Sequence, residues 1–528
     1  MKNSSKILLG FMLVMMICCV SAVSATDING TDDAIITDDI AVDDVSEIVE
    51  DVEIDDASDD VVEEQNLRNT TGNINGNSYT NYFDNNGYLN DSSVYTLTFN
   101  GYFDEVSPAF GNFKINRSIA LELSNATFHN IGFDIYANNV DVVDTTFTGD
   151  ASATNNATIG VYAKNVAIAN VNIDVAAPEG RDFYAIDIEN TENTHLINNT
   201  IIYNCNYTNP TNFNYGIKAK NTPNMIIRNN KLNATVPLKT VNWALSGSID
   251  ADYVAGVAIE NCTSVNFIGN TLNVIGDRRA GDYPTLDAFI IANTKNAVIE
   301  DNIINENDIV TAKNQYSYIY GIDVYSCDNI HINNNTVNMN GNRSGGHIEG
   351  GNGTGVAYCI QLSGNHSNVI VSNNKLTTKN QGPNLGIYSQ NYHATSYLKI
   401  YGNTIDVSGK AGSDPWSLVS GIEVQDTNAE IYSNTITVNN TAGYHSGYYA
   451  FGISYAQYTP DLHYYNIHNN NVTVVNGDYA VYLLNNTNVS GRVVDNTLIA
   501  MGDITRCGDN AVFALRSKVT VEDNEPEC

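Results

Sequence analysis

Two acids and a lysine are the residues whose types and spacing best suit acid–base chemistry in this 528-residue chain. Asp187 and Glu189 lie two positions apart, and Lys218 occupies the place equivalent to Asp187 in the next segment of similar pattern. If the two segments are neighbouring strands, all three side chains meet on one face. Acids beside a base suit acid–base catalysis or a metal site. The same arrangement also suits a structural ion pair.

We favour the ion-pair interpretation because the charges alternate from one segment to the next. The predicted ladder consists of Lys164, Glu189, Lys220 and Glu260. Glycoside hydrolysis needs two carboxyl groups about 5 to 10 Å apart. At about 4.8 Å per repeat, Asp187 and Asp323 are about 19 Å apart and Asp323 and Glu423 about 14 Å apart. The sequence therefore predicts a protein that is not an enzyme, with no catalytic residue and no metal site.

Tyrosine is abundant, with 32 residues, and is densest between Thr441 and Tyr465. Its flat ring and hydroxyl suit sugar faces and protein contacts. The predicted ligand-binding residues are Tyr444, Tyr448, Tyr449 and Tyr458. A separate aromatic column precedes a small residue in each repeat, and we expect it to stack in the core or at a corner. This column contains Tyr184, Tyr215, Tyr320, Tyr358, Phe451 and Tyr479.

The elements that position these residues are repeats of about thirty residues, shown by YGIDVYSCDNIHINNNTVNM at 320–339. Each repeat predicts one strand, a polar turn, a second short strand and then an asparagine. The residue after the small one points inward and is β-branched in all twelve aligned repeats. These positions are Val161, Ile186, Ile217, Val257, Ile290, Ile322, Ile360, Ile387, Ile422, Ile453, Val481 and Val512.

The asparagine column predicts a buried corner, where stacked amides bond from repeat to repeat and the residue adopts a left-handed turn conformation. It contains Asn199, Asn230, Asn270, Asn302, Asn335, Asn374, Asn403, Asn434, Asn470, Asn496 and Asn524. The small residue, inward residue and asparagine together resemble the right-handed parallel β-helix proteins. That resemblance implies an all-β solenoid of about 14 coils with an N-terminal cap.

The chain is predicted to have four parts. Residues 1–25 form a secretory signal, with Lys2 and Lys6 before an apolar run. Residues 26–64 form an acidic disordered leader, since 27–64 holds seventeen Asp and Glu and no Lys or Arg. Residues 65–118 form the N-terminal cap and residues 119–528 the β-helix. No transmembrane segment is expected after signal cleavage.

Net charge and predicted secretion limit the possible partners and covalent modifications of the chain. With 25 Lys and Arg against 59 Asp and Glu, nucleic acid is excluded as a partner. Cys507 and Cys528 lie within about one turn of the solenoid and are predicted to form a disulfide. Secretion also makes N-x-S/T glycosylation feasible. The candidate glycosylation sites include Asn69, Asn90, Asn125, Asn206, Asn261, Asn352 and Asn488.

The signal, the acidic leader and NYFDNNGYL, with the repeats, resemble adhesin-like surface proteins of methanogenic archaea. This resemblance implies a secreted, cell-surface glycoprotein that binds glycans or surface proteins of other cells and needs no cofactor. The alternative is a β-helix polysaccharide lyase or glycoside hydrolase. Lyases of this fold use acidic calcium ligands and a basic residue, for which Asp187, Glu189 and Lys218 are the nearest equivalents. A passive spacer that carries glycans is a third hypothesis.

Overall fold

The chain divides into two compact units, Met1–Leu67 and Arg68–Cys528. The structure, a computed structural model, describes residues 71–76, 78–104, 110–150, 156–178, 182–205, 214–237, 239–240, 255–278, 284–310, 317–340, 342–343, 355–379, 382–391, 396–412, 418–459, 463–484, 489–515 and 519–526. All belong to the second unit. The predicted signal and acidic leader lie outside the described residues, and both boundaries remain predictions.

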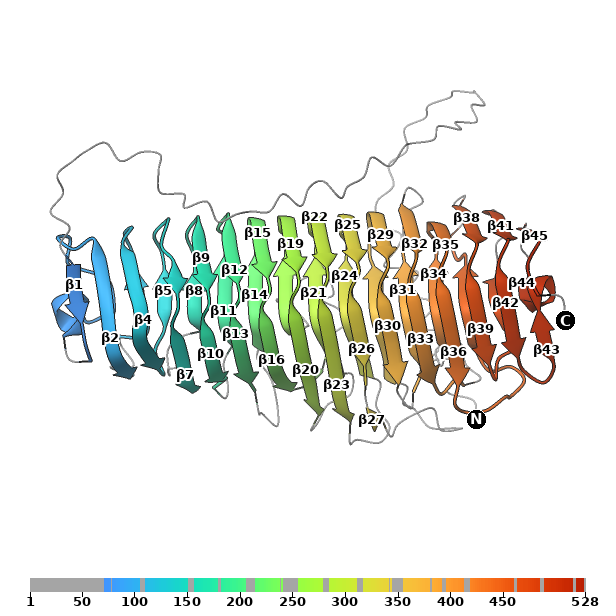
Figure 1. Ribbon diagram of the computed structural model, residues 1–528, viewed down its shortest axis with the longest axis horizontal. Helices are drawn as coiled ribbons and strands as arrows, with labels where there is room; N and C mark the ends of the chain where they lie inside the picture. The colour runs from blue at the N-terminus through green and yellow to red at the C-terminus, as the bar shows by residue number, and fades with distance from the viewer. Residues whose placement is uncertain are drawn as a thin grey trace, which may run out of the picture. The chain divides into compact units, whose positions relative to one another are not determined.

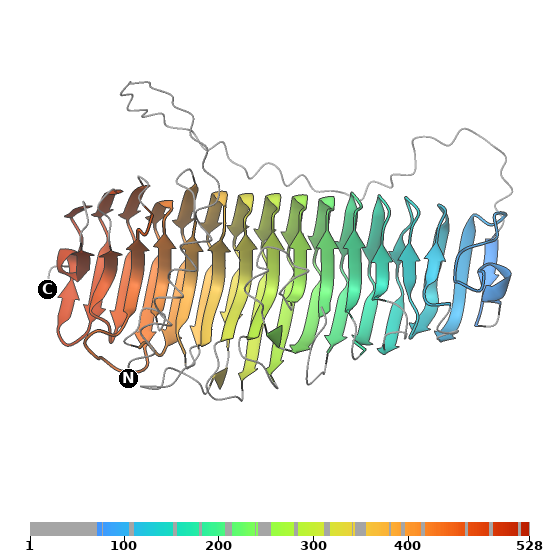
Figure 2. The same ribbon diagram turned by 180° about the vertical axis from the view of Figure 1, so that it is seen from behind.

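The second unit is built from three long sheets of almost entirely parallel strands (Figures 1 and 2). The 15-stranded sheet comprises β3 (Phe113–Ile115), β5 (Phe133–Ile135), β8 (Ala157–Val161), β11 (Phe183–Glu189), β14 (Asn214–Lys220), β17 (Lys239–Thr240), β18 (Ala255–Glu260), β21 (Pro284–Ala292), β24 (Ser317–Tyr325), β28 (Gly355–Ser363), β31 (Asn384–Gln390), β34 (Val419–Gln425), β37 (Ala450–Ala456), β40 (Tyr479–Leu484) and β44 (Val512–Leu515). The 13-stranded sheet comprises β6 (Val142–Val143), β9 (Val166–Ala169), β12 (Thr194–Ile197), β15 (Pro223–Arg228), β19 (Thr263–Ile268), β22 (Lys295–Glu300), β25 (Asp328–Asn333), β29 (Ser367–Ser372), β32 (Tyr397–Tyr401), β35 (Asn428–Tyr432), β38 (His463–His468), β41 (Val489–Val494) and β45 (Val519–Glu522).

The 17-stranded sheet completes the three. It comprises β1 (Thr71–Ile74), β2 (Thr96–Asp104), β4 (Ala120–His129), β7 (Thr146–Asp150), β10 (Asn172–Ala176), β13 (Thr200–Asn204), β16 (Lys231–Pro237), β20 (Thr271–Arg278), β23 (Ile303–Val310), β26 (Thr336–Met339), β27 (Asn342–Arg343), β30 (Lys375–Lys379), β33 (Thr404–Gly409), β36 (Thr435–Asn440), β39 (Asn471–Val475), β42 (Thr497–Met501) and β43 (Thr505–Cys507). Two short 3-10 helices, η2 (Tyr79–Asn81) and η4 (Gly508–Ala511), accompany the strands.

Each repeat gives one strand to each sheet, and equivalent strands of successive repeats pair in parallel. Thus β11, β12 and β13 form one coil, and they pair with β14, β15 and β16 of the next. The predicted all-β parallel β-helix is therefore confirmed. The sequence identified two of the three strands; the third is the short strand that begins after the asparagine.

The inward column of the 15-stranded sheet differs from the prediction at two of its twelve positions. Ile159, not Val161, pairs with Ile186. Phe289, not Ile290, pairs with Val257 and Ile322. Both shifts have a packing cause. Gly160 leaves room for the Tyr162 ring, and the Phe289 ring stacks inside the core on Phe267, with centres 4.4 Å apart.

A ladder of asparagine side chains connects the coils at the corner between the 13- and 17-stranded sheets. Asn302, for example, donates from Nδ2 to Asn335 Oδ1 at 2.8 Å and to the Phe267 carbonyl at 2.8 Å. Its own Oδ1 accepts from the backbone N–H and the side chain of Asn270. All eleven predicted ladder asparagines are at most 6% exposed. The left-handed residue is the one before each of them, such as Asp301 or Asn334, and not the ladder asparagine as predicted.

The predicted cap region contributes to the solenoid where it is described. β1 pairs with β2, and β2 pairs with β4, which lies beyond residue 118. The phenylalanines Phe83, Phe99 and Phe113 pack together in the core at this end. Whether residues 65–118 act as a cap remains a prediction.

We predict that Asn302→Ala lowers the free energy of unfolding by about 2–4 kcal/mol, because buried donors on Asn270 and a buried carbonyl on Phe267 lose their partners. Asn307→Ala, an exposed asparagine on the same strand β23, is the matched control and should change stability little. Thermal unfolding followed by circular dichroism measures both. Equal effects of the two substitutions would contradict a stabilising role for the ladder.

Candidate functional site

The outward face of the 15-stranded sheet carries the residues that the sequence identified as chemically capable. Asp187 lies directly opposite Lys218, and the same outward column continues on every following strand. The column beyond Lys218 reads Ala258, Ile290, Asp323, Gln361, Tyr388, Glu423, Ser454, Tyr482 and Phe513. Its first part is charged and its last part is aromatic, so the face has two chemically distinct regions.

The charged region brings together Asp187, Glu189 and Lys218. Lys218 is ion-paired with Glu189, and its Nζ lies 3.8 Å from Asp187 Oδ1. The same Nζ lies 4.8 Å from the centre of the Tyr184 ring. Burial raises the pKa of Asp187 to about 7, against the opposing effect of Lys218. The hydroxyl of Tyr162 donates to Asp187 Oδ2 at 3.4 Å.

The predicted alternating ladder forms only in part. Lys220 and Glu260 face each other and form an ion pair of 3.1 Å. Lys164 pairs with Glu192 at 2.8 Å and not with Glu189. The reason is the register of β8, which ends before Lys164 and leaves this lysine in the following turn.

Two further carboxyl groups lie on adjacent strands of the same face. Asp287 lies in β21, opposite Tyr320, while Asp323 on β24 lies opposite Ile290. Both acids are at most 2% exposed. Burial raises both pKa values, and Asp323 raises that of Asp287 further. Among the described residues neither oxygen of Asp287 has a hydrogen-bond partner, so we expect the pair to retain a proton near neutral pH.

The aromatic region is the largest group of outward rings, and we call it the aromatic surface. It comprises Tyr318, Tyr320, Tyr358, Tyr388, Tyr449, Phe451, Tyr479, Tyr482 and Phe513. Most of these rings are only partly buried, and they rest on Val356, Leu385 and Leu418. Tyr482 stacks between two of them, with its ring centre 4.1 Å from that of Phe451 and 4.9 Å from that of Phe513.

Part of this surface was predicted to stack in the core or at a corner. The column represented by Tyr320, Tyr358 and Tyr479 points outward, and it belongs to a cluster separate from the main core. Side chains of a strand normally alternate between its two faces. Here the small residue and the β-branched residue that follow the aromatic residue both face the interior, and the aromatic residue before them therefore faces outward. At Gly321, for example, an added Cβ would meet Val337 Cγ1 at 2.5 Å and the Cys359 carbonyl at 2.7 Å.

A polar group lies within the aromatic surface, next to Tyr388. Glu423 accepts a hydrogen bond of 2.6 Å from Gln425, and Tyr388 donates to Gln390 at 3.1 Å and to Gln425 at 3.4 Å. Burial raises the pKa of Glu423 to about 7, despite the hydrogen bond from Gln425. Hydroxyl and amide groups are thus fixed among the rings, where they can bind a hydroxyl-rich ligand.

The four predicted ligand-binding tyrosines are not in one place. Tyr449 packs against the aromatic surface. Tyr458 follows β37 and is 62% exposed. Tyr448 instead packs against the main core and its ring lies 4.7 Å from that of His445. Tyr444 lies in the same turn, beside Gly502. Tyr449 is therefore placed on the aromatic surface. Burial raises the pKa of Tyr458, which lies close enough to Glu423 and Tyr482 for both to raise it further.

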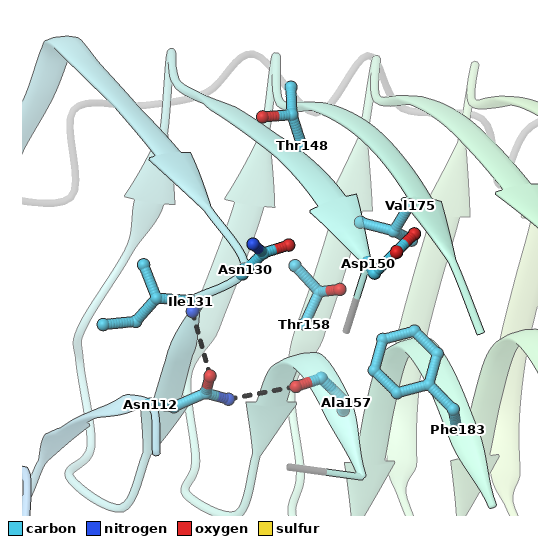
Figure 3. A pocket seen from close by; sticks show the side chains of 10 residues that line it. Asn112, Asn130, Ile131, Thr148, Asp150, Ala157, Thr158, Val175 and Phe183 are labelled. Carbon is cyan, nitrogen blue, oxygen red and sulfur yellow. Dashed lines mark hydrogen bonds between the residues drawn. The ribbon is translucent and has the colours of Figure 1, made fainter. Parts of the chain in front are cut away.

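A small pocket near the N-terminal end of the solenoid is lined by residues of β7, β8, β10 and β11 and of the segments before β3 and β5 (Figure 3). One lining side chain, Asn112, donates to the Ala157 carbonyl at 3.0 Å and accepts from the Gly132 N–H. It also donates to Asp134 at 2.9 Å. These bonds connect neighbouring coils, so Asn112 has a structural role there.

The remaining predicted sites are only partly described. Cys507 is buried and disulfide-bonded; Cys528 lies outside the described residues, so their pairing remains a prediction. Among the candidate glycosylation sites, Asn90, Asn125 and Asn261 are exposed. The sites outside the described residues are Asn69, Asn206, Asn352 and Asn488. Glycosylation itself remains a prediction.

The described part of the chain contains neither a candidate metal site nor a candidate membrane-spanning helix. No group of three or more His, Cys, Asp or Glu side chains there is arranged to hold a metal ion. None of its helices has the length and apolar character needed to cross a membrane.

No protein-family model matches the chain, and no curated protein matches it in sequence. Three solved structures that resemble it are PfbA, a surface adhesin of Streptococcus pneumoniae, the Dettilon tailspike protein and the alginate lyase AlyF-OU02. PfbA has 11% identity and a TM-score of 0.33, over 64% of this chain and 82% of PfbA. The tailspike has 13% identity and a TM-score of 0.32, over 68% and 62%. The lyase has 10% identity and a TM-score of 0.35, over 84% and 89%. TM-scores in this range do not bear on the activity of this chain. Its fold is assigned from the strand pairing.

We predict that Lys218→Met lowers the free energy of unfolding by about 3–5 kcal/mol, because two carboxylates on a buried face lose their counter-charge. Lys164→Met removes an ion pair whose lysine side chain is 53% exposed, so its expected effect is below about 1 kcal/mol. Chemical denaturation of both variants measures the difference. A mild effect at Lys218, similar to that at Lys164, would show that the pair is not needed for stability.

A second prediction concerns pH. The pKa of Glu423 is raised from 4.5 to about 7 in the folded chain, so the native state binds the proton more tightly and this group's contribution to stability falls as pH rises through that range. The melting temperature of Glu423→Gln should therefore rise relative to that of the wild type between pH 5 and pH 8, because glutamine does not ionise. Glu122→Gln, at an exposed position, should show no such trend. A constant difference for Glu423→Gln across this range is the contradicting outcome.

Proposed function

We propose that the chain is an extracellular binding protein for glycans of cell surfaces, and that the aromatic surface is its binding site. The observation that carries the proposal is the set of outward rings, most of them partly exposed, on six of the seven successive strands from β24 to β44; β34, which has no aromatic residue, contributes Glu423 and Gln425 instead. Each ring is fixed by its strand and its neighbours, so little conformational entropy is lost when a ligand binds. Secretion and the resemblance to archaeal adhesin-like proteins remain expectations from the sequence.

The chemistry of the surface suits a sugar chain. Partly buried tyrosines offer apolar ring area and hydroxyl groups together. Gln361, Gln390 and Gln425 add amide donors and acceptors on three of the same strands. A ligand that extends along the solenoid would meet similar groups at each coil, so many weak contacts would add up.

An enzyme remains the second candidate, and one observation favours it. Asp187 has a pKa of about 7 and lies beside Lys218, which gives an acid able to exchange a proton near neutral pH next to a cation. A polysaccharide lyase or hydrolase would need such groups to contact the substrate. Release of unsaturated or shortened sugars, and its loss in Asp187→Asn, would identify this activity.

We predict that Tyr482→Ala weakens retention of the protein on its polysaccharide ligand by about tenfold, because it removes the ring stacked between Phe451 and Phe513. Tyr464→Ala is the matched control: this tyrosine is 43% exposed on the 13-stranded sheet and should leave retention unchanged. Affinity electrophoresis in gels containing a panel of polysaccharides measures both. Equal retention of all three proteins on a bound polymer would place the binding site elsewhere.

A further inference from the structure

The aromatic surface has an unusual charge composition for a strongly polar protein. The seven strands β24, β28, β31, β34, β37, β40 and β44 contain no lysine, arginine or histidine. Their ionisable carboxyl groups are Asp323 and Glu423, both buried. By contrast, β14 of the same sheet contains Lys218 and Lys220. The strands that carry the rings therefore supply no cationic side chain of their own.

One described basic side chain from outside these strands lies at an end of the surface. Arg506, from β43, lies over the Tyr479 ring with its guanidinium carbon 5.0 Å from the ring centre, at the C-terminal end of the surface. The whole chain has a formal net charge of −34. A polyanionic ligand would thus approach a negative protein, and the seven strands of the surface would themselves offer it no cation.

We infer that the aromatic surface selects uncharged glycans and discriminates against acidic ones such as polyuronates. A carboxylate on each sugar would lose hydration against apolar rings without a lysine or arginine of those strands to pair with it. A neutral sugar presents hydroxyl groups that the tyrosine and glutamine side chains bind in either hydrogen-bonding sense. This inference rests on the proposed function and specifies the ligand class of the same surface.

The test compares each neutral polysaccharide that retains the protein with a carboxymethylated form of the same polymer, at low ionic strength. We expect retention on the carboxymethylated form to be at least about tenfold weaker than on the neutral form. This difference in retention should become smaller in 0.5 M salt, because salt screens the repulsion between the acidic polymer and the acidic protein. Gln361→Lys introduces a cation at a partly buried position of the surface. It should reduce the difference in retention between the neutral and carboxymethylated polymers at low salt. Tyr482→Ala should weaken retention on the neutral polymer itself.

The outcomes separate the two claims. Equal or tighter retention on carboxymethylated polymers at low salt would overturn the inference and leave the glycan-binding proposal standing. Failure of the folded protein to be retained by any neutral or acidic polymer would overturn the glycan-binding proposal and the inference with it. Retention confined to acidic polymers, unchanged in Gln361→Lys, would also overturn the inference.

Discussion

The structure depends on keeping successive coils in register at a buried polar corner. Wherever the chain turns from the 13-stranded to the 17-stranded sheet, donors and acceptors become buried and need partners. A ladder asparagine supplies them by bonding the next asparagine and a carbonyl of the preceding coil, as Asn302 bonds Asn335 and Phe267. A one-residue slip would move every side chain of a strand to the other face. The ladder and the inward column therefore fix the register together.

Fixed register makes the chemistry of the outward face continuous from coil to coil. Because equivalent strands pair residue by residue, one side-chain type can continue over many coils without any loop to position it. Tyr482 stacks between Phe451 and Phe513 for this reason, and Lys218 meets Asp187 for the same reason. The same rigid sheet thus carries a buried ionic region and an aromatic one. We attribute glycan binding to the second because its rings are partly exposed, whereas Asp187 and Lys218 are each only 5% exposed.

The repeat was readable from sequence because the ladder asparagines and inward β-branched residues recur with little variation. The candidate site was harder to predict, because it depends on which face of a strand each side chain occupies, and the repeat pattern does not determine this at every position. Two inward residues in succession turn Tyr320 outward, and a shift at Phe289 brings Asp287 onto the face beside Asp323. The stretch densest in tyrosine divides between two environments, since Tyr448 packs against the main core and Tyr449 packs with the aromatic surface. Aromatic residues recurring at equivalent places of successive repeats were the better signal.

The most direct test is hydrogen–deuterium exchange of the full chain with and without a polysaccharide that retains it. The account predicts slowed exchange concentrated in β28, β31, β37 and β40, which carry rings of the aromatic surface, and in β34, which lies between them. Exchange at exposed strands of the 13-stranded sheet, such as β32 and β35, should not change. Protection concentrated on that sheet instead, or around Asp187 and Lys218 together with release of sugars, would contradict a binding role for the aromatic surface.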